Sequence, residues 1–406
     1  MGLYYMKYFI SKLATKDVIY TNLLVKFGVD DESLNELEYT HLMEHLFAFF
    51  TSKKYPHYNQ VHSIFRDNGI TFSAQTDDYY TKYSFSCNKK KLSVLMDVIH
   101  QTINYFQIDE SIFSQEKKSV ILELKTFIES PTYPINTKIN SVLFPNHARS
   151  VSIERWITSI KACKPADIMR FYKKHYRKTN FIVSFCGNIT PATIEKFNIG
   201  TPYVASNKPP RHIQHGPLNK IYKVKKTDAK AYITVCYKVA FGKFDTRIYA
   251  CVALLKILVG GLDTLLYKKL RSDLGLVYSI NDGSVIDPHK DFSFVSIETN
   301  TIDTKSNIQK VIKTITDIVY NLSIEDIDTQ LNKFKIAHKL SLEKHRNCKN
   351  GAHMLNFHTS FIIHGKDPVD FFTYNENHNK LTAIEILELS KQIFTPDNML
   401  VVYSSK

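Results

Sequence analysis

Two histidines and a glutamate lie close together in the segment HLMEH, residues 41–45. On a helix with 3.6 residues per turn, His41 and His45 project within about 40° of each other, and Glu44 lies about 60° to the other side of His41. Zinc accepts neutral imidazole nitrogens, and a nearby carboxylate can take a proton from a zinc-bound water molecule. The spacing therefore favours a metal site, although three polar residues can also share a helix face by chance.

A catalytic zinc needs a third protein ligand, and the segment ESIFSQEKKSVILELKTF offers two candidates. Glu116 and Glu123 are seven residues apart, so they share one stripe of a predicted helix. The apolar residues Val120, Leu124 and Phe127 on this helix are expected to face the core. Because two carboxylates on a mostly apolar stripe are costly without partners, one can bind the metal while the other orients a ligand.

The elements that must position these residues follow a pattern of strands, then helices, then a closing strand. We predict strands at Val18–Val25, Ile70–Ala74, Tyr79–Cys87 and Phe181–Phe185, and helices over about 33–51, 57–68, 91–106, 110–129 and 165–175. In the second half we predict a strand at Ala231–Val239, a helix at Thr246–Val259, a hairpin after residue 275 and a closing strand at Met399–Tyr403. This pattern favours an α+β fold in which helices pack on one face of a mainly antiparallel sheet.

The two halves of the chain end alike, each with an amphipathic helix, an Asn and a strand, which indicates a duplicated unit. Between them the segment 200–219 carries four prolines and no apolar periodicity. We therefore expect two homologous domains, 1–199 and 220–406, joined by a linker over 200–219.

Composition limits the function classes. The chain has 406 residues, of which 44% are hydrophobic and 23% charged, as in ordinary globular proteins. Its net charge of +14 comes mainly from scattered lysines, whereas specific recognition of nucleic acids relies on arginine, so we expect no specific nucleic-acid partner. The six cysteines form no C-x-x-C pair, which favours the cytoplasm or another reducing compartment. No apolar run is long enough to cross a bilayer, so we expect no membrane span.

The segments above match one family. H-x-x-E-H, followed about seventy residues later by E-x6-E, resembles the insulinase/pitrilysin zinc peptidases, the inverzincins, which include mitochondrial processing peptidases. The resemblance implies that His41, His45 and Glu123 bind one Zn²⁺ per chain. It also implies that Glu44 is the general base and that Glu116 supports the ligands from behind.

Two further segments carry the resemblance to substrate-binding residues. NGITFSAQTDDYYTKYSF is similar to a hairpin of the family, which implies that a peptide substrate adds to the strand formed by Phe72, Ser73, Ala74, Gln75 and Thr76. LYKKLRSDLGLVYSI resembles the motif whose Arg and Tyr contact substrate near the scissile bond. Arg271 and Tyr278 occupy these positions, where they are expected to stabilise the developing oxyanion.

The resemblance implies a zinc metalloendopeptidase, a hydrolase that cleaves peptides or presequence-like segments. The two domains would form half of a clamshell chamber. The second domain would be catalytically silent, because RIYACVALLKIL contains no H-x-x-E-H. A dimer is implied, either a homodimer or a heterodimer with a related subunit, in which Arg271 and Tyr278 of one chain face the zinc of the other. The sequence departs from the family pattern in its lead-in LEYT, which lacks glycine, and at Ser73, where an Asn is usual.

Three alternatives stay open. A non-catalytic scaffold or regulatory subunit of a peptidase-like complex would share this fold, since fold alone does not fix function. A nucleic-acid-binding role rests only on the net charge. The histidines of HMLNFHTSFIIH, residues 353–364, could hold a second metal, but dispersed histidines on a helix are the simpler interpretation.

Overall fold

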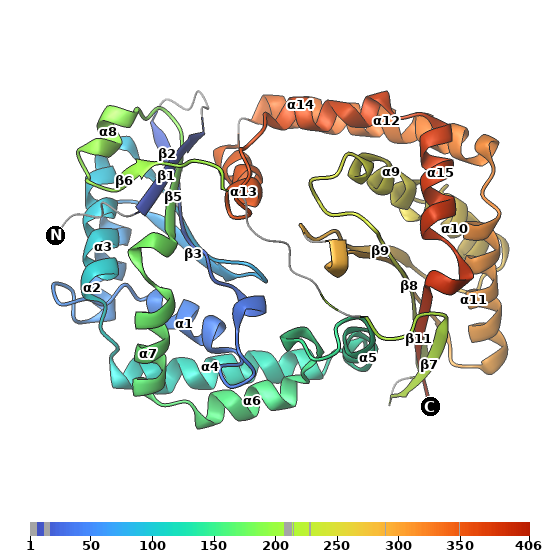
Figure 1. The fold of residues 1–406 in the computed structure, drawn as a ribbon, viewed down its shortest axis with the longest axis horizontal. Coiled ribbons are helices and arrows are strands. Elements are labelled where there is room, and N and C mark those ends of the chain that lie inside the picture. Colours follow the sequence, from blue (N-terminus) through green and yellow to red (C-terminus); the bar gives the residue numbers. More distant parts are fainter. Residues whose placement is uncertain are drawn as a thin grey trace. The chain divides into compact units, whose positions relative to one another are not determined.

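Runs of β-branched and aromatic residues such as VIYTNLLV and ITVCYK form strands, because such side chains fit a pleated, half-buried surface. The computed structural model describes residues 6–11, 17–206, 213, 215–226, 229–288, 290–348 and 350–406. Its contacts divide the chain into two units (Figure 1). Unit 1 comprises Met1–Ile128, Ser152–Lys208 and His345–Phe371, and unit 2 comprises Glu129–Val151, Pro209–Lys344 and Phe372–Lys406.

The sheet of unit 1 has six strands in the order β3-β4-β2-β5-β1-β6. They are β1 (Met6–Ser11), β2 (Val18–Val25), β3 (Thr71–Thr76), β4 (Thr81–Asn88), β5 (Phe181–Cys186) and β6 (Gly200–Pro202). The pairs from β3 to β5 are antiparallel, whereas β1 runs parallel to both β5 and β6. The strand β3 therefore lies at one edge of the sheet.

Most helices of the first half pack with this sheet around one apolar core. They are α1 (Tyr39–Phe47), α2 (Tyr58–Asp67), α3 (Leu92–Tyr105), α4 (Glu110–Ile128), α6 (Ile153–Ala162), α7 (Pro165–His175) and α8 (Pro191–Glu195). On α4, Val120 and Leu124 are buried as predicted, but Phe127 is 57% exposed. The prediction for Phe127 was wrong because this residue lies in the last turn of the helix, where an apolar side chain can extend into solvent.

The sheet of unit 2 has five strands in the order β7-β11-β8-β10-β9. They are β7 (Lys220–Lys225), β8 (Lys230–Lys238), β9 (Ile280–Val285), β10 (Phe294–Ile302) and β11 (Met399–Ser405). The helices of the second half are α9 (Arg247–Val259), α10 (Leu265–Tyr267), α11 (Lys305–Tyr320), α12 (Ile324–Cys348), α13 (Gly351–Ile362), α14 (Phe371–Glu376) and α15 (Ala383–Ile393). Among the described strands of this second sheet, β7 and β11 pair in parallel and the other pairs are antiparallel.

One helix from each half of the sequence packs in the unit built mainly from the other half. The helix α5 (Tyr133–Leu143) lies against β7 and β11, where Ile135 and Ile139 pack in one apolar cluster with Leu400. The helix α13 packs on the sheet of unit 1, and Asn22 on β2 donates hydrogen bonds to Asn356 and Thr359. This cover explains why every residue of β5 is buried, since both faces of the strand are shielded from water.

The predicted α+β class, with mainly antiparallel sheets packed against helices, is confirmed by this arrangement. The helix predicted over 33–51 is shorter, because Glu38 and Phe50 adopt φ angles of 67° and 52°. These left-handed conformations cannot continue a right-handed helix. Part of the predicted linker, residues 207–212 and 214, lies outside the described residues. The domain boundaries and the half-chamber stay predictions.

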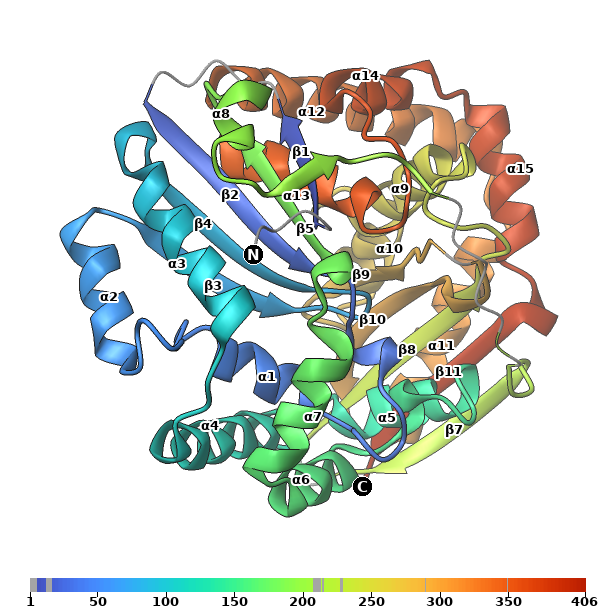
Figure 2. The same ribbon diagram turned by 60° about the vertical axis from the view of Figure 1, so that its left-hand side comes forward.

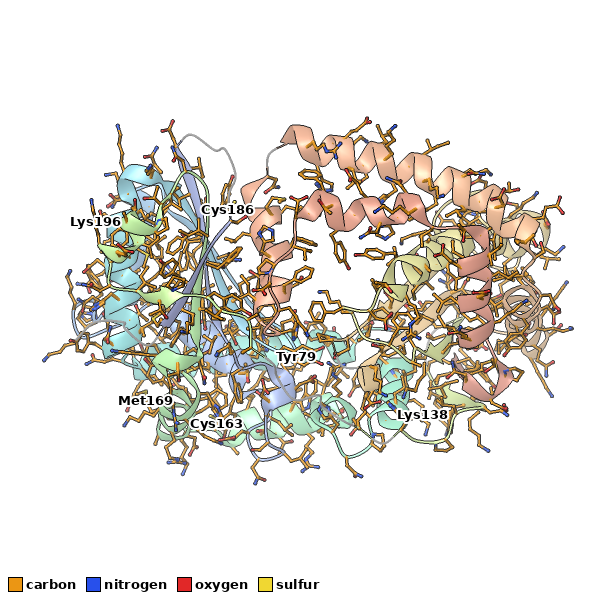
Figure 3. All side chains as sticks on the ribbon, turned by 45° about the horizontal axis from the view of Figure 1, so that its top comes forward. Tyr79, Lys138, Cys163, Met169, Cys186 and Lys196 are labelled. Carbon is orange, nitrogen blue, oxygen red and sulfur yellow. The ribbon has the colours of Figure 1, made fainter. Side chains whose placement is uncertain are left out.

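Five cysteines are buried and free within the described residues, including Cys163 and Cys186 (Figure 3). The side chain of Cys348 lies outside them. Burial raises the pKa of the Cys163 thiol to about 11, with smaller contributions from its neighbours. Buried thiols of this kind are unreactive at neutral pH. Across the described ranges, no helix is both long and apolar enough to cross a membrane.

One buried histidine of unit 2 makes stability depend on pH. His378 packs beside His338, and burial lowers the pKa of His378 to about 4. The hydrogen bond of His378 Nδ1 to the backbone carbonyl oxygen of Asn375 opposes this shift, and the charge of His338 reinforces it. An unfolded histidine titrates near 6.5, so the unfolded chain binds the extra proton first as the pH falls. We therefore expect unit 2 to lose about 2 kcal/mol of unfolding free energy between pH 6.5 and pH 4.5 from this residue.

Urea unfolding followed by circular dichroism at both pH values tests this expectation. The loss should be smaller in His378→Gln, because glutamine does not titrate, and unchanged in a His57→Gln control at an exposed position. Equal losses in the wild-type protein and His378→Gln would contradict it.

Candidate metal centre

The helix α1 positions three of the predicted site residues. Its apolar side, including Leu42, Met43 and Leu46, is buried in the core of unit 1 and fixes the rotation of the helix. His41, Glu44 and His45 consequently share the remaining side. The helix contacts both α4 and β3, which carry the other predicted residues of this site (Figure 2).

The side chains of His41, His45 and Glu123 converge on one point. Oε2 of Glu123 lies 3.3 Å from Nε2 of His41 and 3.9 Å from Nε2 of His45. Each of the three residues offers one potential ligand atom, and these atoms all lie within 4.8 Å of one another. The packing of α4 against α1 thus brings together the three ligand residues that the sequence predicts.

These distances fit a zinc ion. Tetrahedral coordination with bonds of 2.0–2.1 Å places neighbouring ligand atoms about 3.4 Å apart. The separation between Glu123 and His41 already matches this value. The separation of 3.9 Å between Glu123 and His45, and the separation between the two imidazole nitrogens, which is at most 4.8 Å, would adjust through small side-chain rotations. Because the Glu123 side chain is 49% exposed, it has the freedom to make this adjustment. Two imidazoles and one carboxylate also leave one tetrahedral position for water or substrate.

Each imidazole also contacts a further carboxylate through its other ring nitrogen, Nδ1. Nδ1 of His45 lies 2.9 Å from Oε2 of Glu116, and Nδ1 of His41 lies 3.0 Å from Oε2 of Glu38. An ionised carboxylate can only accept hydrogen bonds, so each pair favours the histidine tautomer that carries its hydrogen on Nδ1. The Nε2 lone pair of each ring is then available at the point where the ligand atoms converge.

The electrostatic environment of His41 is strongly acidic. Burial by itself would lower the pKa of His41, but its hydrogen bond to Glu38 and the charges of Glu38, Glu44 and Glu123 raise the pKa above the usual value. Several carboxylates around two imidazoles favour a cation at this point of the structure. A bound divalent metal would balance these negative charges in place of a proton on His41.

The turn before α1 is held by a buried glutamate. Glu32 accepts hydrogen bonds from the backbone N–H groups of Glu38 and Thr40, both at 2.7 Å. Burial raises the pKa of Glu32 to about 8, with an added contribution from the charge of Glu38 and a smaller opposing effect of these hydrogen bonds. Glu38 itself has φ 67° and ψ 8°, a left-handed conformation that costs a non-glycine residue on the order of 1 kcal/mol.

Glu44 is connected to the edge strand of the sheet. It is buried, and its Oε2 accepts a hydrogen bond of 2.8 Å from Oγ1 of Thr76 on β3. The carboxylate therefore stays on the side of α1 that carries His41 and His45. An ionised glutamate in this place can accept a proton from a water molecule bound nearby.

The strand β3 has the properties of a peptide-binding edge. It pairs with β4 on one side only among the described residues. Phe72 and Ala74 pack against the core, whereas Ser73 and Gln75 are directed away from it. An extended peptide could add to the free edge through main-chain hydrogen bonds, with its side chains set by the alternation of the strand.

Arg271 and Tyr278 belong to unit 2, whereas the other predicted site residues belong to unit 1. Nη1 of Arg271 donates a 2.6 Å hydrogen bond to the backbone oxygen of Tyr278, and its guanidinium lies over the rings of Tyr267 and Tyr278. The Tyr278 side chain is 73% exposed. The two predicted residues thus form one local cluster that presents an aromatic ring and a cation to solvent.

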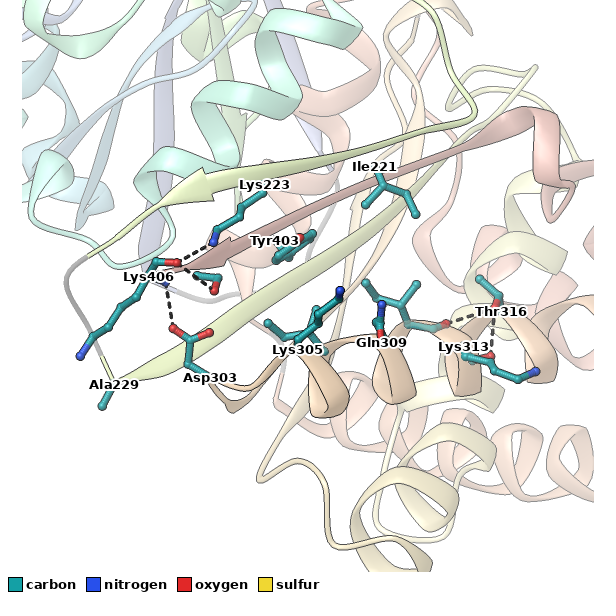
Figure 4. Close-up of a pocket in the computed structure, with 13 residues that line it drawn as sticks. Ile221, Lys223, Ala229, Asp303, Lys305, Gln309, Lys313, Thr316, Tyr403 and Lys406 are labelled. Carbon is teal, nitrogen blue, oxygen red and sulfur yellow. Dashed lines mark hydrogen bonds between the residues drawn. The ribbon is translucent and has the colours of Figure 1, made fainter.

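A hollow of about 740 Å³ lies elsewhere in unit 2 (Figure 4). Its lining comes mainly from β7, β11 and α11, and it includes Ile221, Lys305 and Tyr403. Lys406 closes one end, where its backbone N–H donates to Asp303. None of the predicted site residues, all of which the structure describes, lines this hollow.

Two residues of the site were missing from the sequence prediction. Glu38 precedes His41 by three residues, a spacing that places side chains on one face of a helix and could have indicated the pair. No signal in the sequence indicates Glu32, because it reaches the start of α1 through an irregular turn. Thr76 was predicted as a strand residue, but its bond to Glu44 was not.

The fold and these side chains define the class of protein: a two-unit α+β protein with a candidate metal centre beside an edge strand. The chain belongs to the insulinase/pitrilysin family. Residues 8–154 match the family model described as insulinase (peptidase family M16), and residues 162–333 match the model described as the peptidase M16 inactive domain. The resemblance inferred from the motifs is thereby confirmed.

Relatives with similar sequences are named zinc proteases. An uncharacterized zinc protease of Bacillus subtilis, YmxG, is 22% identical over 376 residues, which cover 90% of this chain and 88% of the relative. An uncharacterized zinc protease of Rickettsia bellii is 24% identical over 331 residues, covering 76% of each chain.

Solved structures share the fold at low sequence identity. A protease from Helicobacter pylori superposes with a TM-score of 0.81 at 17% identity, covering 98% of this chain and 96% of that protein. A peptidase M16 inactive domain from Pseudomonas fluorescens gives a TM-score of 0.80 at 13% identity, covering 98% and 95% of the two chains. These likenesses confirm the architecture.

Proposed function

We propose that this chain is a zinc-dependent endopeptidase. The observation that supports the proposal most strongly is the convergence of His41, His45 and Glu123 within 4.8 Å, with Glu44 on the same side of α1. The names of the bacterial relatives are consistent with this chemistry. We assign His41, His45 and Glu123 as the ligands of one Zn²⁺ per chain.

Bound zinc would polarise a peptide carbonyl and lower the pKa of a water molecule. In the proposed reaction Glu44 accepts a proton from that water and later delivers it to the leaving amine. Thr76 holds the Glu44 carboxylate in place for both transfers. Glu116 keeps His45 in the tautomer that leaves Nε2 available.

The proposed substrates are peptides or presequence-like segments that bind in extended form. Residues Phe72–Thr76 would pair with the substrate main chain. Because Thr76 at the end of this strand donates a hydrogen bond to Glu44, a peptide bound along the strand would have its reacting carbonyl beside Glu44. Main-chain pairing fixes the position of the peptide with little regard to its sequence. Selectivity would then come from side-chain contacts with residues such as Ser73 and Gln75, which are directed away from the core.

Metal analysis together with peptide cleavage tests the proposal. We expect about one zinc per chain in purified protein, and cleavage of a quenched peptide mixture that stops when a chelator removes the metal. Folded protein without zinc would overturn the catalytic proposal. Zinc without cleavage by the protein alone would favour a scaffold or regulatory subunit, or a requirement for a related partner.

Arg271 is expected to stabilise the transition state without holding the metal. Its guanidinium can donate two hydrogen bonds to a developing oxyanion. We expect Arg271→Ala to lower kcat about 100-fold while zinc content is unchanged. The neighbouring exposed cation provides a matched control, and Lys269→Ala should retain nearly full activity. Loss of zinc from Arg271→Ala would contradict the assigned role.

We further propose that the working unit is a dimer in which Arg271 and Tyr278 of one chain act at the metal of its partner. Mixing Arg271→Ala chains with Glu44→Gln chains then creates dimers that contain one intact composite site. We expect such mixtures to be far more active than either variant alone. No recovery in mixtures shown by mass analysis to contain mixed dimers would contradict action between chains.

A further inference from the structure

We propose that Glu38 is a positioning residue for the metal ligand His41, held in a strained turn for that purpose. The inference rests on the proposed zinc function. It assigns to the first histidine an orienting carboxylate of the kind that Glu116 provides for the second, with His–carboxylate separations of 3.0 Å and 2.9 Å.

The first support is that the Glu38 side chain does not cap the helix that it precedes. Glu38 occupies the N-cap position of α1, where a short side chain such as that of Asp, Asn, Ser or Thr ordinarily accepts a hydrogen bond from the second or third N–H of the helix. No such bond forms. Instead Glu32, from outside the helix, accepts the N–H groups of Glu38 and Thr40. Because Glu32 satisfies the helix start, the Glu38 carboxylate is free to turn toward His41.

The second support is the backbone conformation. A φ angle of 67° suits glycine or asparagine, and a glutamate occupies such a position only when surrounding contacts impose it. The conformation places the side chain under the first turn of α1, where Oε2 reaches Nδ1 of His41. Strain of this kind is often found where a side chain must be held for function.

The third support is burial. Only 4% of Glu38 is exposed, so its carboxylate has little water to interact with and depends on protein partners. His41 contacts this carboxylate and can donate a hydrogen bond to it from Nδ1. A cation bound through Nε2 of His41 would strengthen the Nδ1–H donor and stabilise the buried carboxylate. Metal binding and the Glu38–His41 bond should therefore reinforce each other.

Three variants separate positioning from a structural role. Glu38→Gly removes the carboxylate and also relieves the left-handed strain. Glu38→Gln keeps an acceptor of the same shape for Nδ1–H but removes the charge. Glu36→Gln is the matched control, because Glu36 lies on the same turn and pairs with Lys174 rather than with a histidine.

Zinc affinity is measured by competition with a chromophoric chelator, and stability of the metal-free protein by urea unfolding. We expect Glu38→Gly to weaken zinc binding 10- to 100-fold while the urea midpoint of the metal-free protein stays equal or rises. Glu38→Gln should fall between Glu38→Gly and the wild-type protein, and Glu36→Gln should bind zinc like the wild-type protein. Affinity and stability thus change independently, which a merely structural residue would not produce.

Two results would overturn the inference: zinc binding by Glu38→Gly within twofold of the wild-type protein, or a fall in stability that parallels the loss of affinity with no recovery in Glu38→Gln. A wild-type protein that binds no zinc would instead refute the proposed function. The two failures are therefore distinguishable.

Discussion

Replacing Glu44 by glutamine is expected to leave one zinc per chain and to reduce peptide cleavage by about 1000-fold or more. Glutamine has nearly the same shape, and its amide oxygen can still accept the hydrogen bond from Thr76. It cannot, however, take a proton from water at neutral pH. The metal ligands are other residues, so zinc binding should be retained while peptide cleavage is lost.

The measurement pairs elemental analysis with the initial rate of hydrolysis under saturating substrate. Thr76→Val is a useful companion, because it keeps Glu44 but removes the bond that holds its carboxylate. We expect a smaller loss of kcat in Thr76→Val than in Glu44→Gln. Loss of zinc from Glu44→Gln would mean that this residue is a ligand and not the base.

Glu123→Ala has the second large expected effect, which is loss of the metal itself. Removing one of three protein ligands should weaken zinc binding by more than about 100-fold, beyond the cost of losing an orienting carboxylate. Cleavage should fall in parallel and recover in part when zinc is supplied in excess. The fold should be retained, since Glu123 is half exposed and contributes little to the core.

The control for Glu123 is another carboxylate near the end of the same helix. Glu129 is exposed just beyond α4, and Glu129→Ala should change neither zinc content nor rate. Zinc binding in Glu123→Ala equal to that of the wild-type protein would show that a different residue completes the site. Glu116→Ala would then be the next variant to examine, because its carboxylate lies beside His45.

The local pattern of the sequence predicted most elements that position the site. The strand predicted at Val18–Val25 and the helix predicted over 165–175 have the bounds of β2 and α7. The predicted strand at 70–74 is β3 at Thr71–Thr76. Such segments are predictable because periodic burial requires periodic sequence. The start of α1 was mispredicted, since the left-handed conformation of Glu38 belongs to an irregular turn held by the Glu32 carboxylate, and helical periodicity does not indicate such a turn.

The helices α5 and α13 show what local patterns leave open. Each packs on the sheet of the unit formed mainly by the other half of the chain. An amphipathic helix needs an apolar surface, but its sequence does not specify which surface it will cover. The sequence therefore indicated a duplication without indicating this exchange.

The sequence by itself determined the family, the α+β class and the identity of the residues that can bind zinc, because residue type and helical spacing are local properties. Only the tertiary structure decided that Glu123 on α4 reaches the two histidines on α1 and that Thr76 bonds to Glu44. The spacing of three residues could have indicated the pair of Glu38 and His41, but only the structure shows the left-handed backbone at Glu38 that accompanies their bond. These contacts join segments through packing, backbone strain and burial. Such effects depend on the whole fold, since a side chain finds its partner only after the core has fixed the helices and strands that carry it.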